Sequence, residues 1–361
     1  MIETTPQLTP VNVLTGFLGS GKTTLLQRLL KLPTLRDTAV LMNEFGEVGL
    51  DHHLLERVDE TTVLLQSGCL CCTIRGDLSA ALRELHSKRD RGSVPSYRRL
   101  VIETTGLADP LPVLTTITAD PVLCHHYRLG NVITTVDAVN GESHLDRQQE
   151  SVKQAAVADR LVVTKTELAD RQTVDALIER LRALNPSADI ICASSIEDQA
   201  ERLLAHDLFN LSAKTDEVRR WFAQAASIAV DDGRRGHHHS HDRNRHGDDI
   251  QAFCLAFEEP LDWTAVGIWL TMLLNCHGQA VLRVKGILNI SGEATPVAIH
   301  GVQQLVHAPV HMERWPDEDR RSRIVFITRG LKSARLQRSL SAFLASSSSA
   351  VQRSDDVLSK N

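Results

Sequence analysis

Short apolar runs rich in β-branched residues alternate with amphipathic segments along the first half of the chain and beyond it. In the amphipathic segments apolar residues recur at helical spacing, as at Leu78, Ala81, Leu82 and Leu85. Strands that alternate with helices predict right-handed crossovers and a mostly parallel sheet covered by helices, which is an α/β fold. The predicted strands are 11–15, 39–42, 63–65, 100–102, 132–136, 161–164 and 190–191.

This alternation fades near residue 227, where a polar segment of different composition begins. Residues 231–249 read DDGRRGHHHSHDRNRHGDD and contain no apolar side chain. Such a segment cannot offset the entropy cost of ordering by burying surface, so it predicts a flexible linker. We therefore expect a first domain over 1–227 and a linker over 228–249.

A second, smaller domain follows the linker. Apolar runs at 250–257, 280–288, 297–302 and 324–328 predict strands, and helical periodicity covers 262–274 and 333–343. We expect these elements to form an α+β domain over 250–345. The serine-rich end, 346–361, is expected to be disordered.

Composition and charge narrow the function classes. A net charge of −5 provides no broad basic field, so we expect no nucleic-acid partner. The longest uncharged apolar stretch, 263–274, is too short to span a bilayer, so we expect no membrane partner. The amino terminus lacks the features of a signal peptide, which predicts a cytoplasmic protein. Clustered cysteines in that reducing compartment are more often metal ligands or redox centres than disulfides.

The segment GFLGSGKT fits the phosphate-binding pattern G-x-x-x-x-G-K-[ST] and stands between a predicted strand and a predicted helix. The glycines let successive backbone N–H groups face phosphate oxygens at the start of the helix. Lys22 is expected to reach the β- and γ-phosphates, and the Thr23 hydroxyl to bind Mg²⁺. The residues expected to hold the phosphates are Gly16, Gly19, Ser20, Gly21, Lys22, Thr23 and Thr24.

Two further strand ends carry acidic residues. In RRLVIETTGLADP, Glu103 follows a buried run, where its carboxylate can hold hydrated Mg²⁺ and the Gly106 N–H can sense the γ-phosphate. The alternative for Glu103 is a surface position after an edge strand. Asp137 closes the next strand and is either part of the same site or a turn cap.

The segment LVVTKTELAD predicts a site for the nucleotide base. Guanine presents two neighbouring N–H donors that a carboxylate accepts, whereas adenine presents an acceptor there. Thr164, Lys165 and Glu167 are therefore expected to face the base, with Glu167 selecting guanine. The alternative for Glu167 is a solvated loop charge.

With these motifs in place, the chain resembles the CobW-type metallochaperone GTPases, within the SIMIBI class of P-loop proteins. GFLGSGKTT, MNEFGEVGLD, GCLCCTIRGDL and ETTGLADP match that family's motifs in order and at similar spacing. The resemblance runs from about residue 10 to 225, and WPDEDRRSRIVFITRGL looks like part of the family's C-terminal domain. It implies a P-loop GTPase that delivers zinc, or less often cobalt, to a client metalloprotein.

Two segments depart from the family pattern. The guanine motif of the wider class is Asn-Lys-x-Asp, and this chain reads TKTE over 164–167. The family's QGV reads His300-Gly301-Val302 here.

Three of the seven cysteines, Cys69, Cys71 and Cys72, crowd into one turn. Thiolates suit Zn²⁺, Co²⁺ or Cu⁺ rather than Mg²⁺. Ligands this closely spaced do not close a tetrahedral structural site, which leaves a position for water, Glu44 or Glu47. The resemblance places this turn and the NEFGE loop near the nucleotide, where loss of the γ-phosphate would reshape the ligand set. A packing turn and a redox switch are the alternatives.

The remaining histidines and cysteines have weaker signals. The histidines of the linker either capture metal loosely or belong to a solvated spacer. They are His237, His238, His239, His241 and His246. Cys124, Cys192, Cys254 and Cys276 stand in apolar surroundings and are expected to be core residues.

These residues support three hypotheses of function. The first is a Mg²⁺-dependent GTPase that loads zinc, or less likely cobalt, into a client protein of unknown identity. The second is a P-loop kinase for a small molecule, which leaves the cysteine turn unexplained. The third is a zinc buffer without catalytic activity, in which the P-loop only stabilises the fold.

Overall fold

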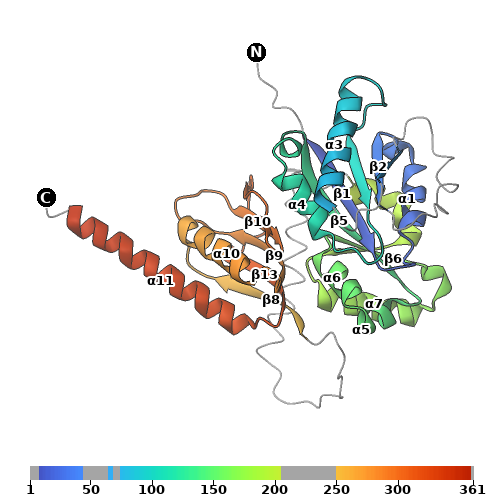
Figure 1. The fold of residues 1–361 in the computed structure, drawn as a ribbon. Coiled ribbons are helices and arrows are strands. Elements are labelled where there is room, and N and C mark those ends of the chain that lie inside the picture. Colours follow the sequence, from blue (N-terminus) through green and yellow to red (C-terminus); the bar gives the residue numbers. More distant parts are fainter. Residues whose placement is uncertain (1–7, 44–63, 68–73, 205–248, 359–361) are drawn as a thin grey trace. The chain divides into compact units, whose positions relative to one another are not determined.

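The computed structural model describes residues 8–43, 64–67, 74–204 and 249–358 (Figure 1). The chain divides into two compact units, the first comprising 1–182 with 188–208 and the second 183–187 with 209–361. The division at residue 208 comes earlier in the chain than the predicted domain end at 227. The predicted linker, apart from its last residue, lies outside the described residues.

The first unit contains a seven-stranded sheet in the order β3-β2-β4-β1-β5-β6-β7, in which every neighbouring pair is parallel. All seven predicted strands are present, so the predicted α/β architecture is confirmed. The strands are β1 Thr9–Gly16, β2 Thr38–Asn43, β3 Leu64–Ser67, β4 Arg99–Glu103, β5 Tyr127–Asp137, β6 Arg160–Thr164 and β7 Asp189–Cys192.

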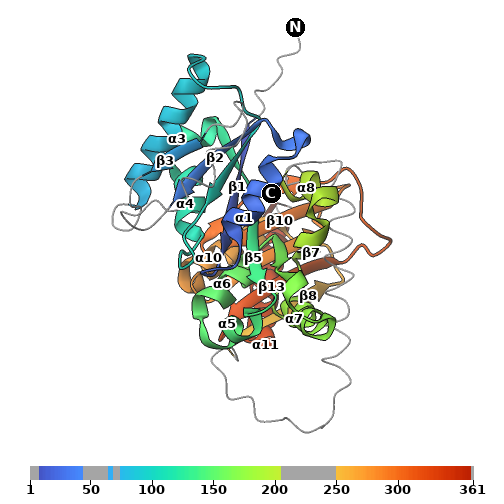
Figure 2. The same cartoon turned by 90° about the vertical axis from the view of Figure 1, so that its right-hand side faces the viewer.

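Helices cover both faces of this sheet (Figure 2). Apolar residues of α1 and α8 share one core with strand residues such as Leu14, Val101 and Ile133. The helices α3 and α4 contact each other. They lie in the crossovers from β3 to β4 and from β4 to β5, which run along the sheet in the direction opposite to the crossover from β1 to β2 that contains α1. The helices are α1 Lys22–Leu30, α3 Ile74–Asp90, α4 Leu111–Ala119, α5 Gly141–Arg147, α6 Gln149–Val157, α7 Arg171–Leu184 and α8 Ile196–Leu204. Short 3₁₀ turns are η1 Pro33–Leu35, η2 Leu123–His125, η3 Thr166–Leu168 and η4 Ala193–Ser195.

The parallel arrangement places the carboxyl ends of all seven strands at one edge of the sheet. Four consecutive strands of the sheet, in the order β4-β1-β5-β6, end at residues that the motifs singled out. In the same order, these residues are Glu103, Gly16, Asp137 and Thr164. The sequence-predicted phosphate, Mg²⁺ and base residues therefore meet along this edge.

The second unit contains an antiparallel sheet in the order β11-β10-β9-β13-β8, with β12 paired to β10. Trp269 of α10 and Phe326 of β13 lie edge to face in its core, with ring centroids 6.2 Å apart. Asp262 caps α10 by accepting from the Ala265 N–H at 2.6 Å. The elements are β8 Ile250–Phe257, α10 Trp263–His277, β9 Val281–Leu288, β10 Val297–Val302, β11 Leu305–Val306, β12 Val310–His311, β13 Ser322–Arg329 and α11 Ser333–Leu358.

The final helix corrects one prediction. The sequence predicted a helix over 333–343 and a disordered end from residue 346, but α11 continues to Leu358. Residues 333–358 contain neither glycine nor proline, and serine has an intermediate helix propensity, so no residue in the serine run breaks the helix. No helix among the described residues is both long enough and apolar enough to cross a membrane.

Candidate functional site

The loop between β1 and α1 adopts conformations that its glycines make possible. At Gly16, with φ +143°, a Cβ atom would lie 2.2 Å from Thr135 Oγ1, so only glycine fits there. Gly21 has φ +84° and caps α1, which begins at Lys22. No side chain in the described part of the chain caps this helix. The first N–H groups of α1 therefore face outward from the loop, as an anion site at a helix N-terminus requires.

Lys22 lies across this loop. Its Nζ donates to the carbonyl oxygens of Gly16 at 2.9 Å and Phe17 at 3.2 Å. Burial lowers the pKa of Lys22, and the nearby Glu103 carboxylate opposes that shift. These contacts hold the ammonium group against the loop, where a bound phosphate would place negative charge beside it.

Thr23 and Glu103 form the second part of the site. The Thr23 hydroxyl donates to Glu103 Oε1 at 2.6 Å, and Glu103 is buried. Since β4 lies between β2 and β1 in the sheet, the alternative of an edge strand for Glu103 is wrong. A hydroxyl and a carboxylate are hard oxygen donors, so this pair fits Mg²⁺ and not a soft metal.

The segment after β4 packs against the phosphate loop. A Cβ atom at Gly106 would lie 2.7 Å from the backbone N and Cα of Leu18, so the two backbones approach at glycine distance. Gln154 of α6 fixes this turn by donating to the carbonyl oxygens of Gly106 at 3.2 Å and Ala108 at 2.9 Å. The predicted neighbourhood of Gly106 and the phosphate loop is therefore present.

Hydroxyl groups attach the phosphate loop to the strands on its other side. Ser20 Oγ and Thr135 Oγ1 are hydrogen-bonded at 2.7 Å, and Thr164 Oγ1 donates to the Ser20 carbonyl at 2.7 Å. The sequence prediction placed Thr164 beside the base, whereas its hydroxyl supports the loop in this structure. Thr135 was not predicted as a site residue, and its only signal in the sequence is that it is a polar residue near the end of a buried strand.

Lys165 and Asp137 form an ion pair at the base end of the site. Lys165 has a positive φ of 56°, and its Nζ lies 2.7 Å from Asp137 Oδ2. Asp137 also accepts from the Val139 N–H at 2.8 Å and from Asn140 Nδ2 at 2.9 Å. Although burial raises the pKa of Asp137, these hydrogen bonds, first that of Lys165, hold it below its usual value. Asp137 therefore caps the turn after β5, as one of its two alternatives predicted, and also holds the Lys165 ammonium group.

Glu167 lies in η3 with an exposed side chain, two residues beyond Lys165. Thr24 is exposed in the first turn of α1. The geometry therefore brings the predicted phosphate and Mg²⁺ residues together, while Glu167 lies in the turn that follows β6 at the same sheet edge.

The predicted transition-metal ligands lie outside the described residues. They are Glu44, Glu47, Cys69, Cys71, Cys72, His237, His238, His239, His241 and His246. Within the described ranges, no three His, Cys, Asp or Glu side chains are grouped so as to hold a metal ion. Cys124 and Cys276 are exposed and Cys192 and Cys254 partly so, which corrects the prediction that these four are core residues.

A family model for the CobW/HypB/UreG nucleotide-binding domain matches residues 10–192, more than half of the chain. The chain belongs to the CobW family. A second model, for the C-terminal domain of the cobalamin synthesis protein CobW, matches residues 250–344. These two matches confirm the resemblance read from the four motifs.

Two relatives of this CobW-family chain match it over most of its length. It is 33% identical to the zinc chaperone YjiA of Escherichia coli, over 88% of this chain and 93% of that protein. It is 28% identical to the zinc chaperone CobW of Pseudomonas aeruginosa, over 93% of this chain and 92% of that protein. The crystal structure of Zn(II)-bound YjiA GTPase from E. coli superposes with a TM-score of 0.64 at 27% identity, covering 93% of this chain and 99% of that one.

Proposed function

We propose that this protein is a Mg²⁺-dependent GTPase that binds zinc and transfers it to a client metalloprotein. The observation that carries the proposal is the pairing of Thr23 with Glu103 beside the Lys22 loop, at the sheet edge that β2 and β3 also reach. The relatives named zinc chaperones, and the Zn(II)-bound YjiA GTPase, support zinc as the cargo and GTP as the nucleotide.

The phosphate and Mg²⁺ residues provide positioning and charge for phosphoryl transfer. The Lys22 ammonium balances charge on the β- and γ-phosphates, and the first N–H groups of α1 bind their oxygens. Thr23 and Glu103 would hold Mg²⁺, which when bound neutralises charge that develops during hydrolysis. Gly106 packs against Leu18 of the phosphate loop, so we expect its turn to change conformation when the γ-phosphate is lost.

Guanine recognition is assigned to the turn after β6. Lys165, held by Asp137, provides an aliphatic stem against which a base can pack. Glu167 is exposed and can accept both guanine N–H donors. Thr164 acts indirectly, by holding the Ser20 carbonyl of the phosphate loop.

The cargo site is assigned to Cys69, Cys71 and Cys72, with Glu44 or Glu47 completing the ligands. Support comes from the sheet register, in which Asn43 of β2 pairs with Ser67 of β3. The segments that carry these ligands thus begin at adjoining strand ends, on the edge that holds the phosphate loop. Neighbouring strands lie about 5 Å apart, so ligands from both segments can meet at one ion.

Release of the cargo follows from coupling between nucleotide and metal. If the γ-phosphate holds the two segments together, hydrolysis weakens the zinc site and a client's thiol or imidazole groups take the ion. The linker histidines are assigned as a weak accessory metal site. We place this exchange in the cytoplasm, where cysteines stay reduced.

The decisive experiment compares Zn²⁺ affinity of the GDP-bound protein with that of protein bound to a non-hydrolysable GTP analogue. We expect a difference of about 5–150-fold, the usual range of coupling between two ligands. The Cys71→Ser and Cys72→Ser double variant is the control, because it is expected to lose the difference while still binding GTP. Equal affinities in the unmodified protein would disprove transfer, and phosphate appearing only on an acceptor would indicate a kinase.

A further inference from the structure

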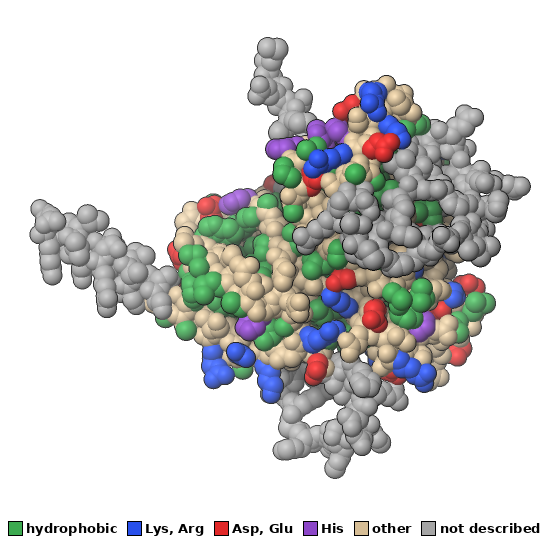
Figure 3. All heavy atoms as spheres, viewed as in Figure 1, with side chains coloured by type: hydrophobic (Ala, Val, Ile, Leu, Met, Phe, Trp, Pro, Cys, Tyr) green, Lys and Arg blue, Asp and Glu red, His purple; other side chains and the backbone are tan. Residues whose placement is uncertain are grey.

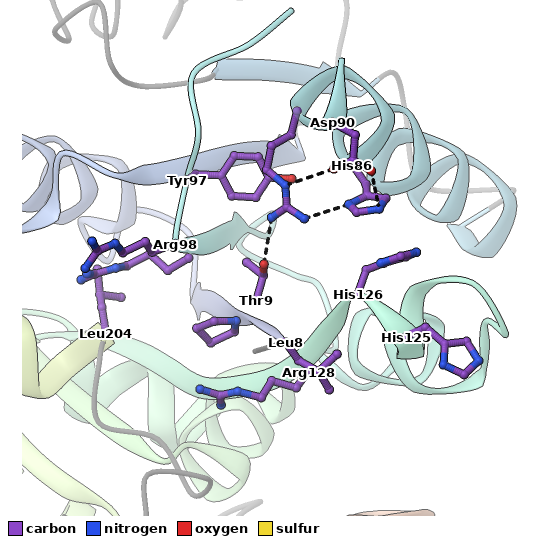
Figure 4. Close-up of a pocket in the computed structure, with 13 residues that line it drawn as sticks. Leu8, Thr9, His86, Asp90, Tyr97, Arg98, His125, His126, Arg128 and Leu204 are labelled. Atoms are coloured by element: carbon purple, nitrogen blue, oxygen red, sulfur yellow. Dashed lines mark hydrogen bonds and ion pairs between the residues drawn. The ribbon is translucent and has the colours of Figure 1, made fainter. Parts of the chain in front are cut away.

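A groove of about 970 Å³ lies at the opposite edge of the first unit's sheet (Figure 4). Its lining includes Thr9, Arg99 and Arg128, which lie at the amino-terminal ends of β1, β4 and β5. Since these strands end at the phosphate loop, Glu103 and Asp137, the groove and the nucleotide site lie at opposite ends of the same strands. The nucleotide site does not use this groove.

Arginine dominates the charge of the groove. Four arginines line it, against one acidic side chain, that of Asp90. They are Arg89, Arg98, Arg99 and Arg128. They come from three elements, namely the end of α3, the beginning of β4 with the residue before it, and the beginning of β5. Histidine, arginine and lysine side chains are also visible at the surface around α3 (Figure 3).

Arg89 is fixed in place by its neighbours. Its Nη1 donates to Thr9 Oγ1 at 2.9 Å, and its Nη2 to His86 Nδ1 at 2.9 Å. Its guanidinium carbon lies 4.7 Å from the centre of the Tyr97 ring. Tyr97 is itself held, with its hydroxyl 2.8 Å from that of Tyr127. This wall of the groove is rigid before any ligand arrives.

The stacked His86 and His126 rings provide a flat wall beside it. Because Arg89 donates to Nδ1, the His86 proton lies on Nε2, which faces Asp90 Oδ2 at 3.1 Å. Burial, His126 and Arg89 lower the pKa of His86, and the Asp90 carboxylate opposes that shift. The His86 and His126 rings stack with centroids 3.7 Å apart. The groove thus offers ring surfaces as well as charge.

Arg99 contributes a partly buried positive charge to the groove. Its side chain is 13% exposed, and its Nη2 lies 3.4 Å from Asp37 Oδ1. Its Nη1 is buried and has no hydrogen-bond partner among the described residues. A guanidinium stays charged at every physiological pH, so an anion bound in the groove would be attracted to this charge. Asp37 also pairs with Arg98, which is mostly exposed at the rim.

We propose that this groove binds a small phosphorylated organic molecule. Arginines contributed by several elements around one groove suit the tetrahedral oxygens of phosphate better than the two coplanar oxygens of a carboxylate. The volume lies at the upper end of the range for small-molecule sites, and the His86, His126 and Tyr97 rings leave apolar surface for the organic part. The site lies in the first unit, at the ends of the strands opposite to the proposed nucleotide site.

Titration calorimetry on the full-length protein saturated with GDP tests this proposal, because GDP blocks the phosphate loop. Inorganic pyrophosphate is the phosphate probe, and citrate and hexaglutamate are the carboxylate probes. We expect pyrophosphate to bind, and the Arg99→Gln and Arg128→Gln variants each to bind it about tenfold more weakly. Arg171→Gln is the matched control, since this side chain is 94% exposed and does not line the groove.

Unchanged GTP hydrolysis in the arginine variants verifies that they are folded. Because Arg99 and Arg128 belong to different strands, the test still holds if one of the two variants does not fold. The proposal is overturned if pyrophosphate fails to bind the GDP-saturated protein, or if all three variants bind it equally. It is also overturned if citrate or hexaglutamate binds with the same arginine dependence and pyrophosphate does not.

Discussion

Thr23 and Glu103 are 80 residues apart in the sequence, yet Thr23 Oγ1 donates to Glu103 Oε1 at 2.6 Å. The contact exists because β1 and β4 are parallel neighbours, with Leu14 opposite Glu103 in the register. The phosphate loop at the end of β1 therefore turns back over the end of β4. The hydroxyl and the carboxylate are hydrogen-bonded to each other, and both are oxygen ligands that would hold the proposed Mg²⁺.

Glu103→Gln tests this assignment, since it removes the charge while keeping the shape and an acceptor oxygen. We expect the Mg²⁺ concentration for half-maximal GTP hydrolysis to rise about tenfold or more, because one charge-assisted interaction contributes roughly 1.5–3 kcal/mol. Hydrolysis measured across a Mg²⁺ titration checks this. Glu179→Gln, at an exposed position on α7, is the control and is expected to match the unmodified protein. An unchanged Mg²⁺ requirement in Glu103→Gln would remove Glu103 from the metal site.

Lys22→Ala is expected to abolish GTP hydrolysis without unfolding the protein. The variant loses the charge that acts on the β- and γ-phosphates. It loses two hydrogen bonds to the loop, but it also removes the cost of burying a charged ammonium group, the burial that lowers the pKa of Lys22. The net change in the free energy of unfolding is therefore expected to be small. Thermal unfolding should shift by no more than about 4 °C, which is about 1 kcal/mol for a unit of this size. Turnover at the normal rate would disprove the phosphate assignment.

Glu167→Ala is expected to narrow the preference for GTP over ATP by about tenfold, since it removes a bidentate charged acceptor. Binding of both nucleotides, measured by fluorescence with labelled analogues, gives the ratio. Asp175→Ala is the control, because Asp175 is an exposed acid on α7 beyond the base turn. If the unmodified protein binds GTP and ATP equally, guanine selection is wrong and a kinase becomes the better hypothesis.

Much of the fold could be predicted because strands buried on both faces appear as short apolar runs, and β4 and β6 are examples. The phosphate loop could be predicted because its characteristic residues follow one another directly in the sequence, from Gly16 to Thr23. The two-residue strands β11 and β12 carry no periodic signal, and both were missed. The contact of Thr164 with Ser20 and the groove around Arg99 join residues from separate segments, so only the folded chain reveals them.

The Asp137–Lys165 ion pair predicts a pH dependence of stability. The folded-state pKa of Asp137 is lowered, so its contribution is fully present above the unfolded pKa, near 4, and is lost as pH falls through the folded value. Asp137→Asn is therefore expected to be less stable than the unmodified protein at pH 7, by an amount that shrinks at pH 3. Urea unfolding at both pH values measures this. A deficit that is equal at both would mean that lost hydrogen bonds, and not charge, account for it.

Zinc is expected to protect Cys69, Cys71 and Cys72 from alkylation, because a thiolate bound to a metal is a poor nucleophile. The chain provides its own controls for this experiment. Cys124 and Cys276 are exposed and are expected to react with iodoacetamide at pH 7.5 with or without zinc. Burial raises the pKa of Cys254 to about 11, so this thiol is expected to react slowly in both cases.

Mass spectrometry of the labelled peptides separates the seven cysteines. Protection should be stronger with the GTP analogue than with GDP, since the proposed coupling tightens the thiolate site when the γ-phosphate is present. Protection of all seven thiols would indicate aggregation and not a site. Protection that is independent of the nucleotide would leave a zinc site without a release mechanism, and the proposed delivery by GTP hydrolysis would then fail even though zinc binds.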